Sequence, residues 1–258
     1  MLQAVIKKKL QRHLREPEKP PEDLITDCFF GPLRYLGARD AGRALAQVCQ
    51  DSRKAAFNAL EGAEVTDVEL WPRRNRVEPD VMVHCSDASG NPLRLMVEVK
   101  WDAPLGDAQA LRQWRAFRTG NEGGDRLLHL VICRRADLIE EEIESQAGEL
   151  KEEGRRAFVD WRNRRLVLTW FDVARRLRDG NGPAWSSTQL RRWALDIQEV
   201  LWWYGERPFR GFAPIPTLAG DHPIERPIFW AHEPAFRWPI AKIIPQHHPI
   251  FWQLEVPR

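Results

Sequence analysis

The fold of this chain is decided by Glu78-Pro79-Asp80-Val81-Met82-Val83-His84-Cys85 and by Leu93-Arg94-Leu95-Met96-Val97-Glu98-Val99-Lys100. Both stretches are short, apolar and rich in β-branched residues, which predicts two strands. The segment between them, residues 86–92, is dense in turn formers. We therefore expect the two strands to pair as a hairpin.

The alternation of side chains along these strands separates an apolar face from a polar one. Three apolar side chains of each strand share a face that a helix layer is expected to cover: Val81, Val83 and Cys85, and Leu95, Val97 and Val99. The opposite face gathers Asp80, Glu98 and Lys100, and His84 shares it. Charged groups are costly on an apolar strand unless they are paired or bound, so their presence indicates a site.

The three charged residues suit metal-assisted phosphate chemistry. The two carboxylates and the Val99 carbonyl provide the hard oxygen ligands that Mg²⁺ prefers. A metal held there would polarise a phosphoryl oxygen and lower the pKa of a bound water. The amine of Lys100 would orient that water or neutralise developing charge.

The rest of the chain alternates helix and strand patterns. Apolar periodicity and buried runs predict the order helices, three strands, helix, strand, helix, strand, helices. Antiparallel strands followed by crossover units describe a mixed α/β sheet flanked by helices. The predicted helices cover about 22–36, 40–60, 105–119, 136–153, 172–179 and 187–204, and the further strands cover 65–71, 127–133 and 165–171.

Composition divides the chain into three parts. Residues 1–20 form a charged N-terminal arm, residues 21–204 the α/β domain, and residues 205–258 a C-terminal extension rich in proline and tryptophan. That extension holds 10 of the 19 prolines, which predicts extended rather than helical backbone. We expect it to wrap the core or dock on a partner.

Charge and cysteine content exclude several classes of protein. The 39 basic and 37 acidic residues leave a formal net charge of +2, so bulk charge does not bind this chain to nucleic acid or to an anionic membrane. No run approaches the ~18 apolar residues of a membrane span. The four cysteines are far apart, without a C-x-x-C pair. These features predict a cytoplasmic protein.

Pro79-Asp80 followed by Glu98-Val99-Lys100 resembles the signature of the PD-(D/E)XK nuclease superfamily, which has the restriction-endonuclease-like fold. Both halves lie on one predicted hairpin. An acidic helix begins at Glu22 before it, and the helix after it carries Gln109 and Gln113, which is similar to the Q-x-x-x-Q/Y element of many members. The segment 22–36, together with Glu98-Val99-Lys100-Trp101, Gln109 and Arg112-Gln113-Trp114, also resembles bacterial nucleases of defence and mobile-element loci. The resemblance covers roughly residues 22–135.

The resemblance implies a role for each site residue. Asp80 and Glu98, with the Val99 carbonyl, would bind Mg²⁺ or Mn²⁺, and Lys100 would be the catalytic lysine. Glu22 would be a further metal ligand, a role for which Asp23 and Asp27 compete because the helix register is open by a residue or two.

Other residues would support or extend the site. Gln109 and Gln113 would orient Lys100 or contact the DNA backbone. Arg73, Arg74 and Arg76 would contact phosphates at the rim of the cleft, and a solvated turn explains them equally well.

The function expected from the resemblance is a metal-dependent DNA nuclease in anti-phage defence or mobile-element control. The near-neutral charge predicts weak autonomous binding to DNA, and hence a homodimer or a helicase, ATPase or recognition partner. The alternative is a catalytically inactive copy of the fold that serves as a scaffold subunit in a nucleic-acid-processing complex.

Overall fold

A computed structural model of the chain describes residues 22–51, 53–106, 108–118, 126–148, 152–179 and 187–206. They belong to one compact unit, which ends at Arg210. The predicted N-terminal arm and nearly all of the C-terminal extension lie outside the described residues. Within the described part, no helix is long and apolar enough to cross a membrane.

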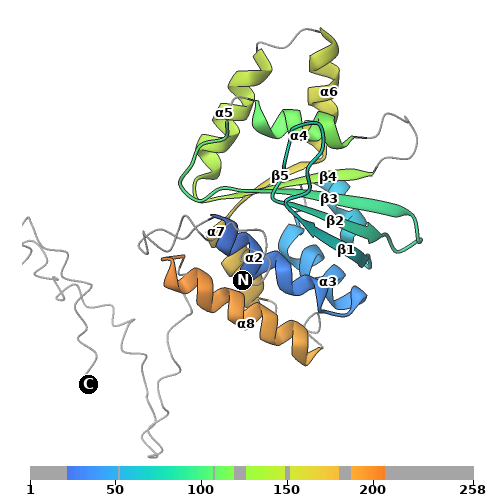
Figure 1. The fold of residues 1–258 in the computed structure, drawn as a ribbon, viewed down its shortest axis with the longest axis vertical. Helices are drawn as coiled ribbons and strands as arrows, with labels where there is room; N and C mark the ends of the chain where they lie inside the picture. The colour runs from blue at the N-terminus through green and yellow to red at the C-terminus, as the bar shows by residue number, and fades with distance from the viewer. Residues whose placement is uncertain are drawn as a thin grey trace, which may run out of the picture. The chain divides into compact units, whose positions relative to one another are not determined.

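The centre of the fold is one five-stranded mixed sheet with the order β1-β2-β3-β4-β5 (Figure 1). The first three strands pair antiparallel, and β4 and β5 continue the sheet in parallel with β3. This arrangement confirms the predicted mixed sheet. The strands are β1 (Glu64–Leu70), β2 (Val81–Ser86), β3 (Pro92–Val99), β4 (Leu127–Cys133) and β5 (Arg165–Thr169).

Helices cover both faces of this sheet (Figure 1). One face packs against α2 (Glu22–Phe30), α3 (Ala38–Cys49), α7 (Trp170–Asp179) and α8 (Thr188–Trp203), together with the 3-10 helices η2 (Gly31–Arg34) and η3 (Ala55–Leu60). The other face packs against α4 (Gln109–Phe117), α5 (Ala136–Gly148) and α6 (Glu152–Asn163).

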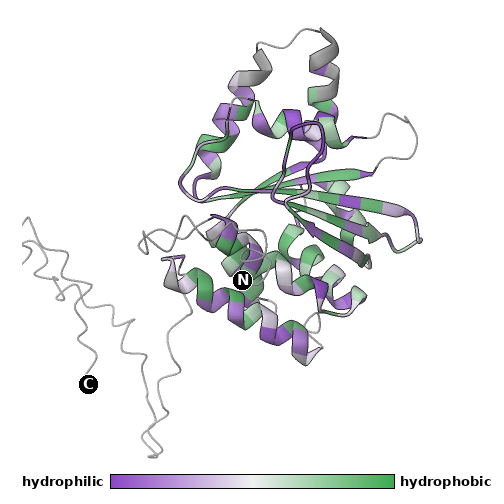
Figure 2. Ribbon diagram, viewed as in Figure 1, coloured by the Kyte–Doolittle hydropathy of each residue, from purple (hydrophilic) through white to green (hydrophobic). Residues whose placement is uncertain are grey.

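The hairpin of β2 and β3 divides its side chains between these layers as the alternation predicts. Its apolar set lies in the core under α2, α3, α7 and α8, whereas Met82 and Met96 pack under α4, α5 and α6. In Figure 2 green hydrophobic stretches run along the strands of the sheet and alternate with purple hydrophilic ones. Glu98 lies among these buried strand residues with 1% of its surface exposed, so the hairpin buries a charge in its own core.

Several predicted boundaries were wrong. The strand predicted over 165–171 ends at Thr169 because Thr169 and Asp172 form a capping box: each backbone N–H donates to the other's side chain, at 3.2 and 2.9 Å. α7 therefore starts at Trp170. The acidic helix predicted over 136–153 is two helices, α5 and α6.

Two further helices are shorter than predicted. The helix predicted over 40–60 ends at Cys49, and the chain continues as η3. The helix predicted over 105–119 begins only at Gln109, after Ala108 with its left-handed φ of 45°. A turn in which the Gln109 N–H donates to the Gly106 carbonyl at 2.8 Å occupies the segment before it.

Candidate active site

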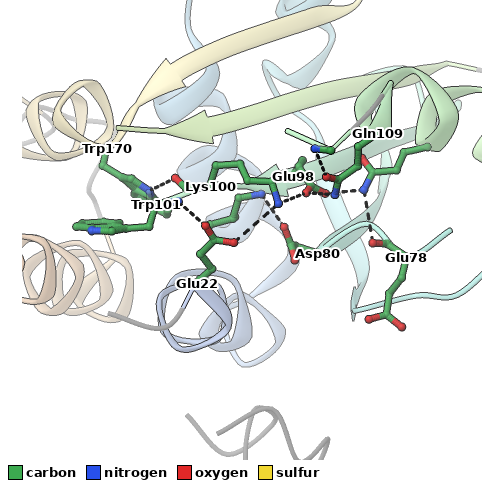
Figure 3. A network of polar contacts seen from close by, with 11 residues as sticks. Glu22, Glu78, Asp80, Glu98, Lys100, Trp101, Gln109 and Trp170 are labelled. Atoms are coloured by element: carbon green, nitrogen blue, oxygen red, sulfur yellow. Dashed lines mark hydrogen bonds and ion pairs between the residues drawn. The ribbon is translucent and has the colours of Figure 1, made fainter. Parts of the chain in front are cut away.

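Four charged residues meet at the end of the β2–β3 hairpin (Figure 3). Glu22 is the first residue of α2, Asp80 immediately precedes β2, Glu98 lies on β3, and Lys100 follows the last residue of β3. These four residues are called the acidic cluster below. The structure thus brings together residues that lie up to 78 positions apart in the sequence.

Glu98 is the most firmly held member of this cluster. Its Oε1 lies 2.8 Å from the Lys100 amine and accepts a hydrogen bond of 2.5 Å from Gln109. Its Oε2 accepts a hydrogen bond of 2.6 Å from Gln113. Both glutamines therefore donate to Glu98, so within the described contacts they orient this carboxylate and not Lys100.

Asp80 is tied to the neighbouring strand through its side chain. Its Oδ2 accepts a hydrogen bond of 2.7 Å from the Val99 N–H, and its carbonyl accepts one of 2.8 Å from the Trp71 N–H. Burial, followed by the nearby negative charge of Glu98, raises the pKa of Asp80 well above its ordinary value. Burial also raises the pKa of Glu98, although Lys100 opposes this rise. Burial thus penalises the charged form of both carboxyl groups, and Lys100 opposes that penalty.

Lys100 lies between two carboxylates. Its amine is 2.8 Å from Glu98 and 3.8 Å from Glu22, and its side chain is 12% exposed. Burial by itself would lower the pKa of Lys100, but the attraction of Glu98 and Glu22 outweighs it and raises that pKa above its usual value. The amine is therefore a cation at neutral pH.

Glu22 enters the cluster from the opposite helix layer to the two glutamines. Its Oε1 accepts a hydrogen bond of 2.8 Å from the Trp101 N–H. Asp27, one of its two rivals for the predicted ligand role, is 1% exposed and packs beside Gly31. The helix register thus directs Glu22 to Lys100.

The backbone at Lys100 is held at three points, none of which the sequence indicated. The Lys100 N–H donates to the Ile132 carbonyl on β4 at 2.7 Å. Its carbonyl accepts a hydrogen bond of 3.2 Å from the Trp170 indole (Figure 3). Together with the Trp101–Glu22 contact, these bonds fix the direction in which the lysine leaves the strand. Since Trp170 lies 70 residues further on, no local pattern could have identified it.

The predicted DNA-contacting arginines lie in the turn between β1 and β2, and all three are exposed. Arg74 and Val77 close this turn with reciprocal backbone hydrogen bonds of 2.9 and 2.8 Å. Arg73 pairs with the Glu78 carboxylate at 3.3 Å, and the Glu78 carbonyl is 3.5 Å from the Gln113 amide. This chain of contacts joins the turn to the cluster, and phosphate contact by Arg73, Arg74 and Arg76 stays a prediction.

His84 does not join the acidic cluster in the described contacts. Its Nε2 lies 3.4 Å from the Glu69 carboxylate on β1. A structural role on the sheet face therefore accounts for His84.

The donor chemistry of the cluster fits a hard divalent cation. Asp80, Glu98 and the Val99 carbonyl are oxygen donors of the kind Mg²⁺ prefers, and burial is the main cause that raises the pKa of both carboxyl groups. Among the described residues, no three His, Cys, Asp or Glu side chains form a group that could hold a metal ion, so Glu22 does not complete a three-carboxylate set with Asp80 and Glu98. Metal binding by Asp80, Glu98 and the Val99 carbonyl, with or without Glu22, stays a prediction.

Comparison of the chain with models of known families, with characterised proteins and with solved structures gave no match.

Proposed function

We propose that this chain is a metal-dependent DNA nuclease of the PD-(D/E)XK type. The observation that carries the proposal is the meeting of Asp80, Glu98 and Lys100 at one end of a hairpin, with Lys100 2.8 Å from Glu98. The same lysine is flanked by a carboxylate from each side. A structural ion pair needs one acid, whereas this cluster has three.

The topology supports the restriction-endonuclease-like part of the proposal. A helix that brings an acid to the site precedes three antiparallel strands, and a helix and a parallel strand follow them. The helix after the hairpin contributes Gln109 and Gln113 to the site, as the resemblance implies. This order of elements and this placement of the two glutamines support the proposal.

The residues of the cluster have distinct roles in the proposed reaction. Asp80, Glu98 and the Val99 carbonyl would hold Mg²⁺ or Mn²⁺, which supplies Lewis-acid polarisation of the phosphate and a more acidic bound water. Lys100, cationic and fixed through its backbone, would orient the attacking water and stabilise negative charge as it develops on the phosphate. Gln109 and Gln113 hold Glu98 in one orientation, and a bound metal would share or replace some of these contacts.

The test is cleavage of plasmid and of single-stranded DNA in the presence of Mg²⁺ or Mn²⁺. Wild type is compared with Asp80→Ala and Lys100→Ala, and both substitutions are expected to abolish cutting. Arg39→Ala is the matched control, since Arg39 pairs with Glu64 on the exposed surface. Cutting that survives both site substitutions would overturn the assignment.

A scaffold role for the same fold is the second candidate, and one observation favours it. Both oxygens of Glu98 are already occupied by Lys100, Gln109 and Gln113, so a metal must displace or share these contacts. Absence of cutting under every metal condition, combined with an unchanged melting temperature on addition of Mg²⁺, would favour the scaffold.

The charge balance bears on how the proposed nuclease finds DNA. A net charge of +2 gives little long-range attraction to the phosphate backbone. We therefore propose a homodimer or a helicase, ATPase or recognition subunit as the partner that delivers DNA, with anti-phage defence or mobile-element control as the setting. Tight binding of random duplex by the isolated chain at physiological salt would contradict this.

A further inference from the structure

A pocket of about 480 Å³ opens directly beside Lys100. A volume of this size lies within the ~300–1,000 Å³ range of sites for small organic groups. It is built from the segment that follows β3, the end of β4 and the start of α5. Its lining is Lys100, Trp101, Asp102, Ala103, Pro104, Cys133, Arg134, Arg135, Leu138, Ile139, Glu142 and Glu206.

The lining includes a rigid flat layer. The Arg134 guanidinium lies over the Trp101 ring, 5.4 Å from its centroid. Its Nε and Nη1 pair with Glu206 at 3.2 Å and with Asp102 at 3.0 Å. Trp101 in turn packs against the Trp170 and Tyr204 rings, at centroid distances of 5.9 and 5.8 Å. A guanidinium held at its edges in this way presents its face, and planar guanidinium groups stack on nucleobases.

The charge of the lining favours a nucleobase over a phosphate as the group that the pocket binds. Its three cations are Lys100, Arg134 and Arg135, and its three acids are Asp102, Glu142 and Glu206. Arg135 is itself paired with Asp137 at 2.6 Å. The balance gives no net attraction for a phosphate, whereas carboxylates accept hydrogen bonds from the N–H groups of bases.

The rim adds an apolar contact. Leu138 on α5 is a large hydrophobic residue with 51% of its surface exposed, and Pro104 also lines the pocket. Apolar and planar groups together suit the face of a base. A base that is paired and stacked inside a duplex cannot enter such a pocket, so entry requires an unpaired nucleotide.

We propose that this pocket binds the base of an unpaired nucleotide adjacent to the phosphate at Lys100, stacked on Arg134 and contacting Leu138. The inference rests on the proposed nuclease function, because it places that nucleotide next to the cluster through Lys100, which borders both. It names the substrate class: single-stranded DNA or frayed strand ends, in preference to continuous duplex. Figure 3 shows Trp101 on the side of Lys100 away from Gln109, and both Trp101 and Lys100 line the pocket.

Binding without metal tests the pocket separately from chemistry. The probe is a fluorescein-labelled mixed-sequence single strand of about twelve nucleotides, compared with the same strand in a blunt duplex, in EDTA with the full chain. Wild type is expected to bind the single strand about tenfold more tightly than the duplex, because stacking of one base supplies roughly that factor. Leu138→Asp and Arg134→Ala are each expected to remove most of this preference.

The matched control is Leu195→Asp. Leu195 on α8 is 59% exposed, so it tests the same charge change at a similarly exposed leucine outside the pocket. Its single-strand binding is expected to equal that of wild type. Circular dichroism melting of all three variants verifies folding, and Leu138→Asp, at an exposed helix position, provides the decisive comparison if Arg134→Ala melts early.

The outcomes separate the pocket from the nuclease. One outcome is DNA cleavage that requires Asp80 and Lys100 yet is the same in the pocket variants and on single-stranded and duplex DNA. That result overturns the proposal of base binding in the pocket and leaves the proposed nuclease function standing. Single-strand binding that follows the pocket variants without cutting under any metal supports the pocket and overturns the nuclease. Equal binding of both probes by wild type overturns the pocket.

Discussion

Two clusters of buried and partly buried polar groups lie at opposite ends of the parallel strands. The acidic cluster sits where β3 ends. The second, called the basic cluster here, consists of His129 on β4, Trp161 on α6 and Arg165 at the start of β5, all at most 2% exposed. In the basic cluster the Trp161 indole donates to His129 Nδ1 at 2.9 Å, and the Arg165 guanidinium lies 4.7 Å from the Trp161 ring centroid.

The two clusters treat buried charge in opposite ways. In the basic cluster the histidine stays uncharged, because burial, followed by repulsion from Arg165, lowers the pKa of His129 to about 3. The charge of Arg165 is paired with Glu140, whose side chain is 44% exposed. The acidic cluster concentrates charge around Lys100 and borders a pocket. Of the two, only the acidic cluster combines carboxyl groups of raised pKa with an adjoining pocket, a combination typical of sites where chemistry takes place.

The largest contrast should come from replacing each cluster's cation by methionine. Lys100→Met is expected to lower cutting by about 10³-fold and to reduce the free energy of unfolding by about 3 kcal/mol, because Glu98 stays buried without its partner. Arg165→Met should leave cutting unchanged and alter that free energy by less than about 1 kcal/mol, since its carboxylate partners reach solvent. Chemical denaturation and plasmid cleavage measure both. Equal losses of cutting and of unfolding free energy in the two variants would show that the two clusters do not differ in function.

Acid should weaken the basic cluster. An unfolded histidine has a pKa near ~6.5, whereas folded His129 titrates at about 3, so the folded state binds fewer protons between these values. Its contribution is constant above pH ~6.5 and falls by roughly 1.4 kcal/mol per pH unit below it. Urea unfolding of wild type and His129→Gln from pH 7 to 4 should show a shallower loss in the variant. Parallel curves would contradict the buried neutral histidine.

Removing one negative charge should relieve the acidic cluster. Asp80→Asn is expected to raise the free energy of unfolding in metal-free buffer by about 1–2 kcal/mol, because active-site charge is commonly held at the expense of stability. Addition of Mg²⁺ should then raise the melting temperature of wild type and not of the variant. A variant less stable than wild type would show that Asp80 serves the fold through its bond to Val99.

The smallest contrast concerns single hydrogen bonds. Gln109→Ala removes one donor to Glu98 and Trp161→Phe removes the donor to His129, and each should cost about 1 kcal/mol of stability. Only Gln109→Ala should also lower cutting, by several-fold, since it loosens Glu98. If Trp161→Phe lowered cutting as much as Gln109→Ala, the basic cluster would also contribute to activity, contrary to the expected contrast.

The alternation of the β2–β3 hairpin was readable in the sequence because strand side chains alternate with a period of two. It placed Val81 and Val97 in one core and Glu98 on the opposite face, and the boundaries of β4 followed from its continuous apolar run. The separate helix α6 and the basic cluster were missed. Their signals, a pair such as Phe158 and Trp161 or a lone His129 within an apolar run, are common to many buried segments.

The acidic residues of the site could likewise be recognised in the sequence from their types and from their spacing across a predicted hairpin. Strand pairing and side-chain alternation were sufficient to predict that Asp80 lies near Glu98. Only the tertiary structure decided which groups surround them. Glu22 arrives from one helix layer and Gln109 from the other, while Trp170 reaches the Lys100 carbonyl from the far end of β5. The physical reason is that strand alternation acts between neighbours, whereas layer packing and parallel crossovers join residues separated by many tens of positions.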